Sequence, residues 1–76
     1  MSTSTTTRRV PSPYAAGLRV WRDTPRGRER GTVVEVTDDW QRLGIQLYQA
    51  IVVRVDGQDV PVTSAWLGWY RLGGRR

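Results

Sequence analysis

The chain of 76 residues contains no cysteine, no histidine and no lysine. Without cysteine it has no disulfide bonds or thiol nucleophiles, and without histidine it also lacks the ligands of most zinc and iron sites. We therefore expect no cofactor, no bound metal and a cytoplasmic location. No segment approaches the roughly 20 consecutive apolar residues that span a membrane, and residues 1–13 have no apolar run typical of a secretion signal. We expect no membrane partner.

The remaining residues support catalysis poorly. General acid–base chemistry near neutral pH uses histidine, or carboxylates and lysines with shifted pKa values, and only carboxylates are present here. Asp38 and Asp39 form the one adjacent acidic pair, and such pairs are more often solvated than catalytic or metal-binding. The serines have no histidine or lysine to activate them, and no glycine-rich phosphate loop occurs. We expect that the chain is not an enzyme.

All 12 basic residues are arginines, and the formal net charge is +5. Two alternative explanations fit the exclusive use of arginine. One is codon preference in a GC-rich genome, and the other is selection for the planar guanidinium group, which suits phosphates and stacked bases. From Gly17 to Leu72, eight arginines face seven acidic residues, so most of the excess charge lies in the tails. Net charge alone is therefore a weak argument for a nucleic-acid partner.

The segment Ala50–Val62 has an alternating apolar run on each side of Asp56-Gly57, which predicts a β-hairpin. A two-residue loop would pair Val53 with Val60, whereas a four-residue loop would pair Val53 with Val62. Because side chains alternate along a strand, both registers turn the same set inward. That set is Ile51, Val53, Val55, Val60 and Val62.

Alternation also predicts strands in residues 18–22 and 31–36, upstream of the hairpin. In this interpretation Trp21 and Val33 face outward. The inward side chains are expected to be Leu18, Val20, Val34 and Val36.

The segments between these strands are less regular. Residues 23–31 contain proline, two glycines and the densest arginine run, which predicts a loop. Residues 37–47 fit either a short helical turn or a long hairpin loop. Residues 64–68 predict a tight turn, and residues 69–72 a short closing strand.

These segments define the expected organisation of the chain. Residues 1–16 are rich in serine, threonine and proline and predict a disordered tail. Residues 17–72 predict an all-β fold, a small barrel of four to five short antiparallel strands. Residues 73–76 form a basic C-terminal tail.

This pattern resembles the SH3-like small β-barrels, especially those of the KOW and Tudor type. The resemblance covers residues 17–72. It rests on the strand at Leu18–Val20, the polar glycine-containing loop, the strand Gly31–Val36, the strand pair across Asp56-Gly57, and the final turn before Trp69-Tyr70-Arg71-Leu72. It implies a binding module that contacts RNA, DNA, ribosomal or polymerase surfaces, or peptide tails, through its loops and one sheet face.

A barrel of this size cannot bury all four tryptophans and three tyrosines. We expect Trp66, together with Trp69, to fill the core or its ends. The aromatic residues expected to be partly exposed are Trp21, Trp40, Tyr48 and Tyr70.

An exposed Trp21 next to the arginine-rich loop would form a surface that stacks bases and binds phosphates. The predicted nucleic-acid-binding residues are Arg19, Trp21, Arg22, Arg26, Arg28 and Arg30. The partner would be DNA or RNA, bound by a monomer. Tryptophan, tyrosine and arginine are also the residues enriched at protein hot spots. The alternative is a protein-interaction module, with a partner at the Trp21 surface or added as a strand near Pro61.

Overall fold

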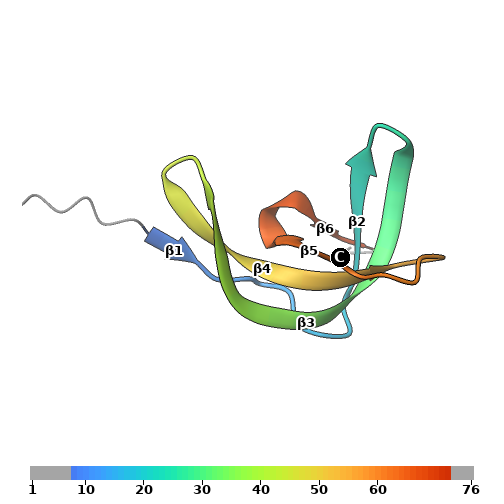
Figure 1. Ribbon diagram of the computed structural model, residues 1–76, viewed down its shortest axis with the longest axis horizontal. Coiled ribbons are helices and arrows are strands. Elements are labelled where there is room, and N and C mark those ends of the chain that lie inside the picture. Colours follow the sequence, from blue (N-terminus) through green and yellow to red (C-terminus); the bar gives the residue numbers. More distant parts are fainter. Residues whose placement is uncertain (1–7, 73–76) are drawn as a thin grey trace, which may run out of the picture.

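The chain folds into one strongly curled β-sheet, seen in a computed structural model that describes residues 8–72 (Figure 1). The single helical element is a short 3₁₀ turn, η1, in the described part of the chain. The prediction of an all-β, barrel-like fold is confirmed. The elements are β1 Arg8–Val10, β2 Arg19–Thr24, β3 Gly27–Leu43, β4 Gln46–Val55, β5 Val62–Ala65, η1 Trp66–Gly68 and β6 Tyr70–Arg71.

The strand order explains how the sheet curls into a half-barrel. The strands run in the order β1-β4-β3-β2-β6, and β5 also pairs with β4. All pairs are antiparallel except β1 with β4. In the C-terminal segment, β5 lies beside β4 and β6 lies beside β2. The η1 turn connects β5 to β6, so this segment links the two sides of the curl. Figure 1 shows β3 and β4 bending together around this segment.

Two of the strands are longer than the short strands expected from the sequence. β3 has 17 residues and β4 has 10. Their register shifts between Val33 and Glu35 and again between Val36 and Trp40, so that β3 carries additional residues opposite β4. Bulges of this kind bend a strand and increase its twist, and here they allow β3 to curve around its partner.

The first shift reverses the predicted orientation of residues 33 and 34, and that prediction was wrong. Val33 is 1% exposed and belongs to the core, whereas Val34 is 49% exposed. Val33 pairs with Val53 and Glu35 with the adjacent Val52, which leaves Val34 as the unpaired residue of a bulge. A strict two-residue alternation cannot reveal such an extra residue.

The second shift decides between the two interpretations of residues 37–47. The segment is neither helical nor a long loop, because β3 continues to Leu43 and a two-residue turn leads into β4. The Thr37 hydroxyl donates to the Ala50 carbonyl (2.9 Å) and accepts from the Asp39 N–H (3.0 Å). The Thr37 side chain therefore satisfies backbone groups beside the bulge.

The core lies inside the curl and is centred on Trp69, which is 1% exposed. Its indole N–H donates to the Ser64 hydroxyl at 3.1 Å, so its one polar group is satisfied. The inward positions predicted for Leu18, Val36 and Val62 are confirmed, since these side chains pack against the core. The buried residues of this core cluster are Val20, Val33, Ile51, Val53, Val55 and Trp69.

The chain after Asp56-Gly57 departs from the predicted hairpin. Val53 pairs with Val62, as in the four-residue register. Val60, however, is 72% exposed, and the prediction that it points inward was wrong. The second strand begins only at Val62 because residues 58–61 leave the sheet, and Pro61 has no N–H to offer a ladder.

Residues 8–16 were expected to belong to a disordered tail, and the structure instead places them against the barrel. Arg8–Val10 pairs in parallel with β4. The Trp66 indole donates to the Val10 carbonyl at 3.1 Å, and the Tyr14 hydroxyl donates to the Trp69 carbonyl at 3.0 Å. Tyr14 packs against the core, and the composition of the segment did not predict this contact. The rest of the predicted tail, residues 1–7, and the C-terminal segment 73–76 lie outside the described residues.

Candidate functional site

The arginine-rich segment is a hairpin, and the prediction of a loop over residues 23–31 was wrong. β2 and β3 pair continuously from Arg19–Thr32 to Thr24–Gly27, with Pro25 and Arg26 as the turn. The Thr24 hydroxyl accepts from the Arg26 N–H (3.1 Å) and donates to the Gly27 carbonyl (2.8 Å), which closes the turn. The arginines are consequently held on strands, whose alternation sends them to two different faces.

Arg22 lies on the inner face, and this separates it from the other predicted site residues. It pairs with Glu29, with Nε 3.0 Å from Oε1. Its guanidinium group lies 4.5 Å from the centre of the Trp69 ring. Both partners tie Arg22 to the barrel core, so we assign it a structural role.

The outer face carries the other predicted residues, and the pairing register places them in rows across the sheet. Tyr70 pairs with Trp21, and Trp21 pairs with Arg30, so these three side chains form one row across β6, β2 and β3. Arg19 lies in a neighbouring row with Thr32 and Arg54. Arg28 also lies on the outer face, opposite Asp23, and Arg26 lies in the turn between the two strands.

Trp21 is sandwiched between an aromatic ring and a guanidinium group. The centres of the Trp21 and Tyr70 rings are 4.7 Å apart at an interplanar angle of 32°. The Arg28 guanidinium lies 4.2 Å from the Trp21 ring centre. Because β2 lies between β6 and β3, Tyr70 and Arg28 approach Trp21 from opposite sides. We call Arg28, Trp21 and Tyr70 the stacked column.

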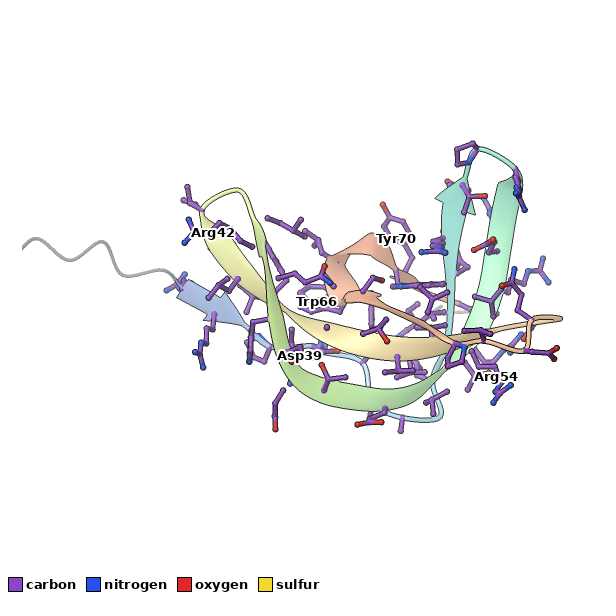
Figure 2. The ribbon with its side chains drawn as sticks, viewed as in Figure 1. Asp39, Arg42, Arg54, Trp66 and Tyr70 are labelled. Atoms are coloured by element: carbon purple, nitrogen blue, oxygen red, sulfur yellow. The ribbon has the colours of Figure 1, made fainter. Side chains whose placement is uncertain are left out.

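Tyr70 is the member of the stacked column that the list of predicted site residues omitted. It is 54% exposed, and Figure 2 shows it beside β2. Its partial exposure was predicted, but its position next to Trp21 depends on the pairing of β6 with β2. Residue order gives no signal for that pairing, because 48 residues separate the two rings.

Acidic residues neutralise part of the positive charge on the outer face. Arg19 forms a two-pronged ion pair with Asp56, at 2.7 and 3.0 Å. Hydrogen bonding to Arg19 holds the pKa of Asp56 below its ordinary value and raises that of Arg19. Arg28 lies 3.6 Å from Asp23, and both side chains are mostly exposed.

The outer-face residues Arg30 and Arg54, and Arg26 in the turn, have no ion-pair partner among residues 8–72. Arg54 was not among the predicted site residues, although the alternation of the β4 strand puts it on the polar face. The outer face therefore keeps guanidinium groups that are available to an anion.

A third arginine–tryptophan contact lies at the other end of the sheet. The Arg9 guanidinium is 5.3 Å from the centre of the Trp40 ring. Arg42 is near the tip of the β3–β4 hairpin (Figure 2). Trp40 and Tyr48 are half-buried, which agrees with their predicted partial exposure.

The described residues contain no group of three or more acidic side chains close enough together to hold a metal ion, and Asp38 and Asp39 belong to no such group. No helix within residues 8–72 has the length and apolar character needed to cross a membrane. Comparisons with protein-family models, curated proteins and solved structures found no match to this chain.

Proposed function

We propose that this chain is a small, non-enzymatic nucleic-acid-binding module that uses the outer face of the β2–β3 hairpin. The observation that carries the proposal is the stacked column of Arg28, Trp21 and Tyr70. Its two ends, the exposed Tyr70 ring and the exposed Arg28 guanidinium plane, are surfaces on which an unpaired base stacks. Arg30, in the same row, adds a donor for phosphate.

The proposal favours single-stranded DNA or RNA over a duplex. Bases in a duplex already stack on each other, so an aromatic ring on an open sheet face reaches them only where the strand is unpaired. The arginines contribute through the phosphates, and that contribution weakens as salt concentration rises.

We also propose that the fold is an SH3-like small barrel and that the module works as a monomer in the cytoplasm. Two of the features that carry the resemblance have counterparts in the structure. The final short turn is η1, and the closing strand is β6, which pairs with β2. The absence of cysteine supports a reducing compartment.

The test is the affinity of the full chain for a labelled single-stranded oligonucleotide of about eight nucleotides, a length within the range that small barrels bind. Replacing Tyr70 with alanine should weaken binding by about 1–3 kcal/mol, roughly five- to 150-fold, because one stacking surface is lost. Trp40→Ala is the matched control, since Trp40 lies on the other hairpin. Equal affinities for Tyr70→Ala and the unmodified chain would refute the proposal.

The second candidate is a protein-interaction module, and the ion pairs of the outer face favour it. Two predicted site arginines of that face are already paired with acidic residues of the chain: Arg19 with Asp56 and Arg28 with Asp23. A face of tryptophan, tyrosine and neutralised arginine suits a protein hot spot. Binding that needs Trp21 but changes little between low and physiological salt would support this candidate over the first.

A further inference from the structure

A hollow of about 370 Å³ lies next to the stacked column, at the end of β4. It forms because β3 begins at Gly27, whereas β4 ends opposite Gly31, so that four residues of β3 run past their partner. The turn after β4 closes one side through the Asp56 N–H, which donates to the Arg30 carbonyl at 2.9 Å. The residues that line the hollow are Arg28, Glu29, Arg30, Val55, Asp56 and Gln58.

Both carboxylates that line this hollow are engaged by arginines that do not line it. Asp56 uses its two oxygens in the ion pair with Arg19. Glu29 is paired with Arg22, at 3.0 Å. The charge of Arg30 also acts on Asp56, but no contact at ion-pair distance joins the two residues, so the Arg30 guanidinium keeps its donors.

Of the two arginines that line the hollow, Arg30 remains available to a ligand. Arg28 and Arg30 are two positions apart on one strand, so they project from the same face. Arg30 has no ion-pair partner in the described part of the chain, and Arg28 has only the exposed contact with Asp23 at 3.6 Å. Gln58 adds an amide group. The Arg30 guanidinium and the Gln58 amide can both donate to a phosphate oxyanion, whereas the Arg28 guanidinium lies over the Trp21 ring.

The position of the hollow relates this anion site to the stacked column. Arg30 pairs directly with Trp21 across β2 and β3, and neighbouring strands lie about 4.8 Å apart. Arg28 is common to both features, since its guanidinium covers the Trp21 ring and the residue also borders the hollow. Trp21 of the column and Arg30 of the hollow are therefore neighbours across one strand spacing.

We propose that the hollow binds one backbone phosphate of a nucleic-acid strand, next to the base that stacks on the column. This inference rests on the proposed function and specifies it. The strand would cross β2 and β3, and Arg30 would be the principal phosphate ligand. A free phosphate ion presents the same oxygens, so the experiment distinguishes the two sources.

The first measurement is the salt dependence of binding to an oligodeoxythymidylate of about eight nucleotides. Arg30→Gln should reduce the slope of log K against log salt by about 0.7, the value for one phosphate contact on a single strand. Arg42→Gln is the matched control, because it removes the same charge from the exposed tip of the other hairpin. Equal slopes for the two variants would overturn the inference, and thermal unfolding of both variants confirms that they fold.

The second measurement separates this inference from the proposed function by NMR of the full chain with three probes. An abasic oligonucleotide should shift the Arg30 Nε and Gln58 amide signals and leave the Trp21 indole signal in place, whereas the oligodeoxythymidylate should shift all three. If the oligodeoxythymidylate shifts Trp21 while Arg30 stays unmoved with both probes, the phosphate site is wrong and base stacking stands. If it shifts none of them, both proposals fail. If inorganic phosphate occupies the site at the same concentration as the abasic oligonucleotide, the site is a free-anion site and the inference is overturned.

Discussion

Arg19 and Asp56 join two strands that are not neighbours in the sheet. Arg19 is on β2 and Asp56 follows β4, with β3 between them, and the guanidinium group meets both carboxylate oxygens at 3.0 and 2.7 Å. The same guanidinium donates to the Thr32 hydroxyl of β3 at 2.8 Å. In the sequence, Asp56 is accounted for by the Asp56-Gly57 turn alone. The structure gives it a second role, because it holds an arginine of the outer face in place.

This ion pair predicts a pH dependence of stability at the acidic end. Because Arg19 lowers the pKa of Asp56 in the folded state, the stabilisation is present above the unfolded aspartate pKa and is lost as the pH falls through the folded value. Arg19→Gln should raise the pKa of Asp56 toward the ordinary value, measured by carboxyl ¹³C NMR. Arg54→Gln, which removes another outer-face arginine, should leave it unchanged. An unchanged Asp56 titration in Arg19→Gln would show that the ion pair does not form in solution.

A substitution at Gly31 tests whether β3 and β4 approach as closely as the structure shows. A Cβ at this position would lie 2.6 Å from both the Arg54 carbonyl oxygen and the Val53 side chain. Since the backbone oxygen cannot move aside freely, Gly31→Ala should lower the free energy of unfolding by about 1–3 kcal/mol, as other overpacking substitutions do. Gly68→Ala is the control, because nothing lies within 4 Å of a Cβ there. Urea unfolding of both variants measures the difference.

Because of the bulge at Val34, substitutions of two adjacent valines should differ in their effect on stability. Val33→Ala should cost about 2 kcal/mol in stability, because it removes buried methyl groups from the core. Val34→Ala should change stability by no more than about 0.5 kcal/mol, since that side chain is exposed. Chemical denaturation of the two variants measures both changes in the free energy of unfolding. The reverse order of effects would mean that β3 has the regular alternation and no bulge.

Tyr14 predicts a loss of stability at alkaline pH. Burial raises its pKa, with the positive charge of Arg71 opposing the shift in part, and its hydroxyl donates to the Trp69 carbonyl. Stabilisation by the neutral phenol is complete below the unfolded tyrosine pKa of about 10 and is lost as the pH rises through the folded value. Because the chain lacks lysine and cysteine, tyrosines are the only side chains that titrate in this range below arginine.

The measurement for Tyr14 is the free energy of unfolding in urea at pH 8 and at pH 11. Tyr14→Phe should be less stable than the unmodified chain at pH 8 by about 1 kcal/mol, the usual contribution of one hydrogen bond. It should also lose less stability between the two pH values. An equal alkaline loss in Tyr14→Phe would contradict the packing of residues 8–16 against the core.

Periodicity and turn chemistry in the sequence were sufficient for the fold class and for most of the core. The alternation of Ile51, Val53 and Val55 before Asp56-Gly57 predicted a buried strand, and all three valine and isoleucine side chains are buried. Leu18 and Val20 followed the same rule. These predictions succeeded because side-chain direction in a regular strand depends only on residue parity.

Only the tertiary structure decided which side chains of the candidate site meet. The bulge at Val34 changed the parity of β3, and no local signal marks an extra residue in a run of valines. The pairing of Tyr70 with Trp21, and of Arg19 with Asp56, joins residues far apart in the chain. The arginine-rich segment was recognisable from composition, but its division between an inner Arg22 and an outer Arg28 and Arg30 followed from strand formation. Long-range pairing sets these contacts, and a local pattern of residues does not contain that information.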